Sequence, residues 1–359
     1  MVVSDLALQT AAIAHADLDL EPLCLAFDEV VRRAVPYTVA AWSTHDPATG
    51  LFTSCTMAGL PKDLEREAQL FRDEFRDDEP ATFRCMIARR QTTAILSAVT
   101  GGDLERASRY RSVLAPFGVS DELRAVLWSA DTPWGSVTMY RNDGARFTTA
   151  HARQMEQIAT HLGEGLRLSM LRLAAARPEA VKEPPGILAV APDGTVTPLT
   201  GPARRWLQLG GTQLRTTANA TAAAVRARTD WEGATARLAL PDGLVLTLHG
   251  AATTVDDGSV AVIVDRTRRA EVGAMLVEAY GLTPRQRDVL GLLLLGASLT
   301  QIGHRLGISE HTANDHRKAI YRRVGVSSRS ELAALLQSEQ YEPRTHRGVP
   351  PSPYGGFLE

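Results

Sequence analysis

The sequence predicts a multidomain α+β protein, in which two mixed segments precede an all-helical C-terminal segment. The length of 359 residues is the first observation, because two or three domains are expected at that size. The hydrophobic content of 44% and the charged content of 22% are those of a folded globular protein. The third observation is the order of patterns, since strand and helix signals alternate up to about residue 268 and only helical signals follow.

The first 176 residues are predicted to form one α/β domain. Turn-forming residues at 45–50 separate two apolar runs of strand length. The predicted elements are, in order, a helix, a hairpin, a helical insert, a second hairpin and a long helix (21–34, 37–44 with 51–57, 64–114, 123–128 with 136–141, 149–176). Thr148 or Thr149 is a suitable cap for the long helix.

This order of elements resembles a GAF domain, a fold that senses small molecules and signals. Trp134 and Gly135 before a strand, and Phe147 and Thr148 before the last helix, are the local resemblances. The resemblance implies a ligand site between the sheet and the helical insert. The side chains that could line such a pocket are Trp42, Phe71, Phe75, Phe83, Cys85 and Met86. Ordinary packing in the core is the more common role for side chains of these types.

The long helix carries an apolar stripe that also bears on oligomeric state. Apolar residues recur along it at spacings near 3.5, at Met155, Ile158, Leu162, Leu166 and Leu173. Part of this stripe is expected to pack on its own domain. A helix of roughly 28 residues is ~40 Å long, more than a small domain covers, so the sequence also predicts a parallel dimer contact.

Residues 177–185 are charged and proline-rich, and a linker is expected there before a second domain at 186–268. The predicted elements are two strands joined by a tight turn, two helices and three closing strands (186–191, 196–198, 202–209, 217–228, 234–240, 244–249, 260–264). This order resembles a reduced PAS domain. Residues 266–280 are expected to form a helical connection to the C-terminal segment.

The C-terminal segment, residues 278–340, has the signals of four short helices. Thr283 can cap the first of them and Pro284 suits its first turn. Residues 299–306 are predicted to form a scaffold helix, which Gly307 can end with a positive φ. Ser309 can cap the next helix, residues 310–324, and a fourth is expected at 329–337, with Leu332, Leu335 and Leu336 packed inward. Two helices joined by such a turn are typical of a helix-turn-helix.

The helix at 310–324 has one polar face and one apolar face. At 3.6 residues per turn the polar face carries His311, Asn314, Asp315, Lys318 and Arg322. Ala313, Ile320 and Val324 fall on the opposite face. A helix with an apolar back and hydrogen-bonding groups in front has the properties needed to read a DNA major groove.

The distribution of charge along the sequence supports a nucleic-acid-binding surface in the C-terminal segment. The whole chain has a formal net charge of −2, so attraction to DNA cannot be a property of the whole molecule. Residues 285–329, however, contain eight Arg and Lys against three Asp and Glu, which leaves +5. The electrostatic footprint that DNA binding requires is therefore confined to the C-terminal segment.

The same segment resembles the LuxR-type helix-turn-helix. The residues that meet the family's pattern are Leu282, Thr283, Arg285, Val289, Leu290, Gly296, Ile302, Leu306, Ile308, Ser309, Thr312, His316, Ile320, Tyr321, Val326 and Arg329. The departures are Gln286 and Gln301 for glutamate, Leu299 for asparagine, Ala313 for valine, and Asn314 for a common basic residue. The loss of that cation puts the corresponding DNA contact in doubt.

The resemblance implies roles for individual residues on double-stranded DNA. Asn314, Asp315 and Lys318 would face base edges in the major groove. The residues that would hold the DNA backbone are Ser309, His311, Thr312, Arg322 and Arg329. A homodimer is expected, because one such helix makes too small an interface and two copies would bind half-sites about one helical turn apart. RNA polymerase is a further partner that this family of regulators suggests.

Other classes of function find little support in the sequence. It contains no Gly-Lys pair, no H-E-x-x-H and no G-x-S-x-G, so we expect no enzyme, no catalytic residues, no cofactor and no metal site. Cys24, Cys55 and Cys85 are widely spaced and expected to be reduced thiols. There is no secretory signal pattern at the start, and the longest apolar run, residues 289–297, is too short for a membrane span. A cytoplasmic location is expected.

Two alternatives remain for the C-terminal segment. Asn314 and Asp315 dilute its positive face, so it could be a degenerate helix-turn-helix that binds protein while the rest of the chain senses a ligand. A sigma-factor-like protein is the second alternative, although no companion core-binding segment is apparent. Residues 341–359 are rich in proline and glycine and are expected to form a flexible tail.

Overall fold

The computed structural model describes residues 3–60, 63–129, 131–175, 183–228, 233–254, 257–267 and 280–337. The chain divides into two compact units, Met1–Arg266 and Thr267–Glu359. The first unit contains two five-stranded sheets, and the described part of the second is helical. These observations agree with the predicted α+β multidomain class.

The first sheet is antiparallel and has the order β2-β1-β5-β4-β3. Its strands are β1 (Val39–His45), β2 (Phe52–Ala58), β3 (Thr93–Ile95), β4 (Asp121–Ser129) and β5 (Thr132–Arg141). The helical insert between β2 and β4 consists of α3 (Leu64–Glu74), α4 (Phe83–Ala88), α5 (Leu96–Val99) and three short turns, η1 (Leu104–Arg106), η2 (Tyr110–Leu114) and η3 (Ala115–Phe117). The GAF-like element order predicted from sequence is therefore present.

The second hairpin is tighter than the sequence indicated. Asp131 adopts a positive φ of 66°, and β5 begins at Thr132 rather than near residue 136. Gly135 consequently lies inside the strand, where a Cβ atom would come within 2.3 Å of the Ser43 carbonyl oxygen and 2.5 Å of Leu166. Glycine is needed at this position because of the close approach of its neighbours.

Two helices, α2 (Leu20–Ala34) and α6 (Thr149–Ala175), pack on the face of this sheet opposite the insert, and α1 (Val3–Ala14) packs against both of them. Trp42 of β1 belongs to this face. Its ring lies 6.1 Å from that of Phe27, and its Nε1 donates to Asp28 Oδ1 at 3.1 Å. Trp42 is thus a hydrogen-bonded core residue.

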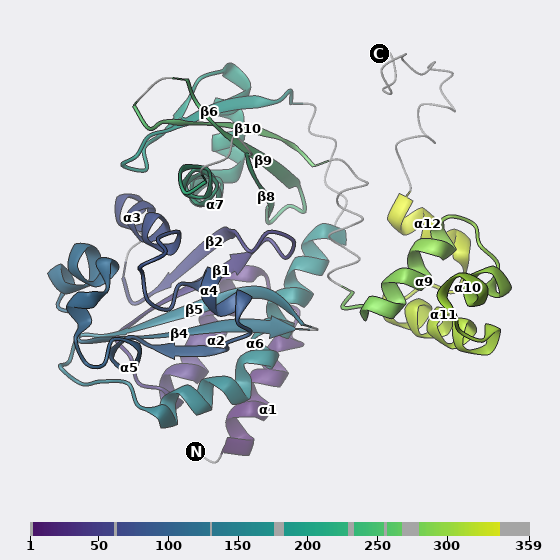
Figure 1. Ribbon diagram of the computed structural model, residues 1–359, viewed down its shortest axis with the longest axis horizontal. Coiled ribbons are helices and arrows are strands. Elements are labelled where there is room, and N and C mark those ends of the chain that lie inside the picture. Colours follow the sequence, from purple (N-terminus) through teal and green to yellow (C-terminus); the bar gives the residue numbers. More distant parts are fainter. Residues whose placement is uncertain are drawn as a thin grey trace. The chain divides into compact units, whose positions relative to one another are not determined.

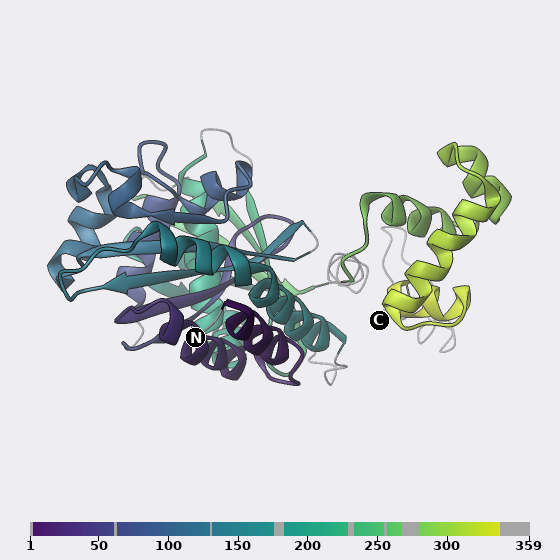
Figure 2. The ribbon, with the colours of Figure 1, turned by 90° about the horizontal axis from the view of Figure 1, so that it is seen from below.

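The predicted dimer stripe on α6 is buried within the chain. Met155, Ile158, Leu162 and Leu166 are at most 1% exposed, and Leu173 is 8% exposed. Helix α1, which was not predicted from the sequence, lies against α6 (Figure 2) and covers surface that would otherwise be free. The prediction that this stripe forms a parallel dimer contact is therefore wrong, because α1, α2 and the sheet already cover it.

The second sheet repeats the strand order of the first, as β7-β6-β10-β9-β8. Its elements are β6 (Gly186–Val190), β7 (Val196–Pro198), α7 (Gly201–Arg226), β8 (Ala234–Ala239), β9 (Val245–Ala252) and β10 (Val260–Arg266). The two helices expected at 202–209 and 217–228 form one element with a break at Gly211, whose φ and ψ are 51° and −132°. The PAS-like order of strands and helices is otherwise as expected.

Helix α7 joins the two sheets into one core. Figure 1 shows it between the second sheet and the pair α3 and β2. Leu214, Ala218 and Ala222 pack with the second sheet, whereas Ala220 and Ala223 belong to a cluster with Phe52 and Phe71 of the first. The PAS-like segment is consequently not a structurally separate domain, because its central helix is buried on both sides.

The second unit contains α9 (Pro284–Leu294), α10 (Leu299–Leu306), α11 (Glu310–Val324) and α12 (Arg329–Gln337). The last three have the bounds that the sequence predicted. Capping boxes at Thr283 with Gln286, and at Ser298 with Gln301, begin α9 and α10. Leu332 is fully buried, as expected. The predictions for 176–182, 268–279 and 341–359, and for the side chains of Leu335 and Leu336, concern parts of the chain outside the described residues.

Among the helices that the structure describes, none is both long and apolar enough to cross a membrane.

Candidate functional site

The turn between α10 and α11 is fixed by local hydrogen bonds. Gly307 ends α10 with φ and ψ of 64° and 37°, and Ser309 Oγ accepts from the Thr312 amide at 3.0 Å. A Cβ atom on Gly303 would lie 2.7 Å from the Ile308 carbonyl oxygen, so the turn packs directly on the α10 backbone. The direction in which α11 leaves α10 is therefore set by backbone contacts and a cap.

The apolar back of α11 is packed inside the second unit. Ala313 and Ile320 are fully buried, and Val324 is 8% exposed. The helix contacts both α9 and α10. This burial confirms the predicted apolar face and leaves the opposite face of the helix toward solvent.

The polar front of α11 is mostly open. His311, Asp315, Lys318 and Arg322 are exposed, whereas Asn314 is half-buried. Within the described part of the chain, no ion pair is found for Lys318, Arg322 or Arg323. Asp315 has a partner, because its Oδ2 lies 3.1 Å from His311 Nδ1. The face therefore offers free cations and one partly engaged carboxylate.

Asn314 is held by a neighbour that the sequence analysis did not consider. Arg317 Nη2 donates to Asn314 Oδ1 at 2.8 Å, and the Arg317 guanidinium carbon lies 5.7 Å from the centre of the Tyr321 ring. A guanidinium group can only donate, so the Asn314 atom facing it is the oxygen. The Asn314 amide nitrogen is then the group that remains available as a donor.

Three residues expected on the DNA backbone have internal partners. The hydroxyls of Ser309 and Thr312 lie 2.8 Å apart at the start of α11. Arg329 is half-buried, and its Nη1 donates to the Ala297 carbonyl oxygen at 3.4 Å. These contacts stabilise the turn and the start of α12, and the DNA contacts of these residues remain predictions.

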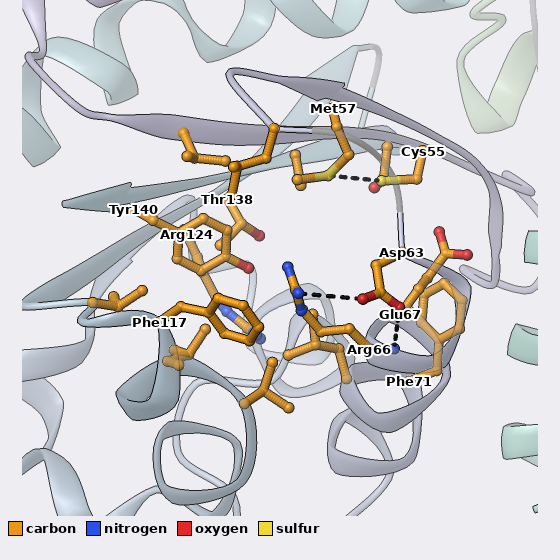
Figure 3. Close-up of a pocket in the computed structure, with 18 of the residues that line it drawn as sticks. Cys55, Met57, Asp63, Arg66, Glu67, Phe71, Phe117, Arg124, Thr138 and Tyr140 are labelled. Carbon is orange, nitrogen blue, oxygen red and sulfur yellow. Dashed lines mark hydrogen bonds and ion pairs between the residues drawn. The ribbon is translucent and has the colours of Figure 1, made fainter. Parts of the chain in front are cut away.

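A second candidate site is a cavity of about 140 Å³ between the first sheet and the helical insert (Figure 3). It lies where the GAF-like resemblance placed a ligand. Its floor comes from alternate residues of the sheet, including Ala41, Ser43, Cys55, Met57, Arg124, Thr138 and Tyr140. Its other walls come mainly from α3 and from η2 to η3, including Arg66, Glu67, Leu70, Phe71, Glu74, Val113, Leu114 and Phe117.

Only two of the six predicted pocket residues line this cavity. Phe71 and Phe83 line it. Trp42 does not, since β1 directs it to the opposite face of the sheet. Met86 is fully buried in a core cluster, to which Phe75 also packs, and Cys85 lies half-buried in α4, outside the lining.

The floor residues Cys55, Met57, Thr138 and Tyr140 were missed. Strand alternation could have grouped them, but it does not show which face of a sheet holds a cavity when helices cover both faces.

Beside the cavity, five charged side chains form a buried network. Arg124 contacts Glu74, and its Nε lies 2.8 Å from Glu122 Oε1. Arg109 contacts Glu79, and its Nη2 lies 2.7 Å from the same Glu122 oxygen. Burial alone would raise the pKa of Glu122, but Arg109 and Arg124 outweigh it and hold that pKa below its usual value. Each guanidinium therefore contacts two carboxylates, and Glu122 is shared between them.

Closer to the opening, Arg66 lies between an acid and an aromatic ring. Its Nη2 is 3.2 Å from Asp63 Oδ2, and its guanidinium carbon is 3.5 Å from the centre of the Phe117 ring. Asp63 also caps α3 by accepting from the amides of Glu65 and Arg66 at 3.1 Å. The Arg66 guanidinium and the Asp63 carboxylate therefore both have partners within the protein.

Comparison with known proteins bears on the second unit. Residues 281–336 match the family described as "Bacterial regulatory proteins, luxR family". The match extends from just before α9 into α12. It confirms the LuxR-type helix-turn-helix predicted for this segment.

Similar curated proteins are regulators. The transcriptional regulatory protein MctR of Rhizobium johnstonii is 43% identical over 51 residues, which are 14% of this chain and 24% of MctR. The nitrate/nitrite response regulator protein NarL of Escherichia coli is 30% identical over 102 residues, 28% of this chain and 47% of NarL. The chain therefore covers less than half the length of either relative.

Among solved structures, similar ones include phytochrome domains. The phycocyanobilin-bound GAF domain from a cyanobacterial phytochrome has 17% identity and a TM-score of 0.35, over 48% of this chain and 97% of that one. The bacteriophytochrome RpBphP3 from R. palustris has 10% identity and a TM-score of 0.32, over 72% and 61%.

Proposed function

We propose that this protein is a sequence-specific, DNA-binding transcriptional regulator of the LuxR type. The observation that carries the proposal is the exposed face of α11, where Lys318 and Arg322 stand without ion pairs in the described structure on a helix whose back is buried. That helix lies within the segment that matches the luxR family. A rigid helix with free cations and hydrogen-bonding side chains fits the major groove in shape and charge.

The residues of this face take different parts in the proposed complex. Lys318 donates to guanine O6 and N7, and Asp315 accepts from a cytosine amine. Asn314 pairs with adenine through its amide nitrogen and the second lone pair of Oδ1, since the first accepts from Arg317. Arg322, His311, Ser309, Thr312 and Arg329 contact phosphates and supply affinity without sequence choice.

Two copies act together in this proposal. A single recognition helix buries too little surface for strong selectivity, so a homodimer reads two half-sites about one helical turn apart. The α6 stripe is buried and does not mediate this dimer. Bound at a promoter in the cytoplasm, the dimer would have RNA polymerase as its further partner.

The first unit is the sensory part of the proposed regulator. Its cavity is lined by apolar and aromatic side chains with a few polar groups, which is the usual composition of a small-molecule site. Helix α3 lies between the cavity and α7 and contacts α7. A ligand that shifts α3 would therefore affect the core that the two sheets share. A small molecule or a protein signal is the proposed input.

Fluorescence anisotropy with labelled genomic DNA fragments tests the DNA-binding proposal directly. Binding should weaken steeply between about 50 mM and 200 mM salt, because neutralised phosphates release counterions. The Lys318→Ala/Arg322→Ala double variant should bind much more weakly at both salt concentrations. If the folded protein binds no DNA even at the lower salt, the proposal is overturned and a protein-binding role for the second unit gains support.

A further inference from the structure

Three hydroxyl groups on the floor of the cavity have no hydrogen-bond partner among the residues that the structure describes. They belong to Ser43 of β1 and to Thr138 and Tyr140 of β5, which point to the same face of the sheet. Figure 3 shows Thr138 and Tyr140 on the sheet, and the Arg66 side chain reaching toward them from α3. No hydrogen bond links these three hydroxyls to any other described residue. Polar groups in such surroundings need partners, and here a ligand or water has to provide them.

The Tyr140 hydroxyl is suited to donate to a ligand. Burial raises its pKa, and the neighbouring Glu122 carboxylate raises it further. The phenol therefore keeps its proton over the physiological pH range. Thr138 and Ser43 can both donate and accept, so the floor as a whole matches a carbonyl or hydroxyl oxygen equally well.

The charged side chains that line the cavity are already engaged. Arg124 is balanced by Glu74 and Glu122 inside the buried network. Arg66 pairs with Asp63. Glu67 accepts hydrogen bonds from Thr216 of α7. A ligand that carried a net charge would therefore have to break one of these contacts or enter without a counter-charge, and burying an unpaired charge is costly.

The remaining walls are apolar and rich in aromatic rings. Phe52, Phe71, Phe83 and Phe117 surround the space together with Leu70, Val113 and Leu114. Rings of this kind favour flat apolar groups, which stack on them or meet them edge to face. Such walls give affinity, and the three hydroxyls give orientation.

From these observations we infer that the cavity binds an uncharged, largely apolar ring compound, whose oxygen atoms are recognised by the hydroxyls of Ser43, Thr138 and Tyr140. This inference rests on the proposed sensory function and specifies the chemistry of its input. A net charge on a ligand excludes it from the cavity, and the oxygen atoms of a neutral ligand determine its orientation there.

Two fluorescent probes with the same ring system separate neutral from charged ligands. N-phenyl-1-naphthylamine is uncharged, and 1-anilinonaphthalene-8-sulfonate is the same compound with an added sulfonate. Titrated into the full-length chain, the neutral probe should bind at least about tenfold more tightly, because the sulfonate finds no unpaired cation. Equal or tighter binding of the sulfonate, especially if it is lost in Arg66→Met, would overturn the inference in favour of an anionic ligand.

A cavity-filling variant shows whether the probe occupies this site. Ala41→Phe places a ring above the floor and should weaken the neutral probe by about tenfold or more, whereas Ala150→Phe adds the same ring at an exposed position and should change nothing. Melting temperatures establish that both variants are folded. If Ala41→Phe is unstable, the site is tested with Thr138→Val instead. This variant keeps the shape of the side chain, removes the hydroxyl, and is used in the competition measurement that follows.

Competition by a matched pair of neutral compounds tests the hydroxyls. 9-Fluorenone and fluorene differ by one carbonyl oxygen. Tyr140→Phe or Thr138→Val should weaken displacement of the probe by fluorenone about twofold to tenfold and leave fluorene unchanged. Equal effects on both compounds, or no displacement of the probe by either, would contradict the assignment of the hydroxyls.

DNA binding measured on the same preparations keeps the two proposals apart. A chain that binds DNA but prefers the charged probe, or binds neither probe, overturns only the ligand chemistry. A chain that binds the neutral probe as described but no DNA leaves the cavity assignment standing and overturns the regulatory function.

Discussion

The Glu67 carboxylate, on the wall of the cavity, accepts hydrogen bonds from the Thr216 hydroxyl at 3.0 and 3.2 Å. One side chain of α3 thus connects the cavity to α7, the helix shared by both sheets. Next to it, the Thr217 hydroxyl donates to the Thr53 carbonyl oxygen at 2.8 Å, and buried Asp46 pairs with Arg237 of β8 at 2.9 Å. One of the polar contacts made by α7 therefore ends at a residue that lines the proposed ligand site.

Removal of the Thr216 hydroxyl should destabilise the first unit by about 1–3 kcal/mol, because the buried carboxylate of Glu67 loses a donor. We expect Thr216→Val and Glu67→Gln to be non-additive, with a coupling free energy of about 0.5–3 kcal/mol in urea unfolding. Thr221→Val is the matched control, since this threonine is equally buried on α7 and donates only to the Thr217 carbonyl oxygen of its own helix. Additivity of Glu67→Gln with Thr216→Val would show that the pair carries no coupling.

His45 should make the first unit less stable in acid. Burial lowers the pKa of this histidine from 6.5 to about 3, and its Nε2 lies 2.9 Å from Ser136 Oγ. Between these pH values the unfolded chain binds a proton that the folded chain does not. The free energy of unfolding therefore falls as the pH falls through this window, by up to about 1.4 kcal/mol per pH unit from this residue.

The variant His45→Gln keeps a polar group beside Ser136 and cannot titrate. Urea unfolding between pH 6.5 and 4.5 should show a shallower loss of stability for this variant than for the parent protein. His249→Gln, at an exposed position of β9, should retain the parent slope. Parallel pH profiles for His45→Gln and the parent would rule out His45 as the source.

Lys318 and Arg322 should contribute to DNA binding in different ways. Lys318→Ala should cost roughly 1–3 kcal/mol and relax base preference at one position, because a base contact is lost. Arg322→Ala should weaken all sequences alike and reduce the log–log salt slope by about one unit. Anisotropy titrations against a panel of single-base variants of a bound fragment distinguish these effects, with Arg33→Ala in the first unit as the control. A uniform loss for Lys318→Ala would identify it as a phosphate contact.

Asp315 should weaken binding to random DNA through its charge, although in the proposed specific complex it accepts from a cytosine amine. Asp315→Asn removes a negative charge from the exposed face of α11 and should tighten binding to random DNA about twofold to fivefold at low salt, with less effect at high salt. The control is Asp288→Asn, an exposed acid on α9 outside this face. On fragments that place a C·G pair against Asp315, the same variant should bind more weakly, because the proposed contact between the carboxylate and the cytosine amine is lost. Equal binding of Asp315→Asn and the parent protein to random DNA would contradict the charge effect.

The C-terminal helices could be predicted almost to the residue because their signals are local. The predicted caps at Thr283 and Ser309 and the left-handed Gly307 depend only on neighbouring residues. The same holds for the two faces of α11, which follow from helical periodicity. Hydrogen bonds such as that between Arg317 and Asn314 depend on side-chain conformation and were not predictable.

The first unit was harder to predict because long-range packing decides its site. The alternation in β1 separates Trp42 from Ala41 and Ser43, but only the positions of α2 and α3 show which side contains the cavity. The α6 stripe appeared unpaired because α1 had not been predicted. The burial of α7 on both sides depends on two sheets that are distant in sequence.

The most direct test of the DNA-reading role of α11 is sequencing of genomic fragments retained by the purified chain, in parallel with the Lys318→Ala/Arg322→Ala variant. We predict that the parent protein enriches one short motif, repeated as two half-sites about one helical turn apart. The variant, although folded by circular dichroism, should lose that enrichment. Fragments without a shared motif, or the same motif retained by the variant, would contradict the account.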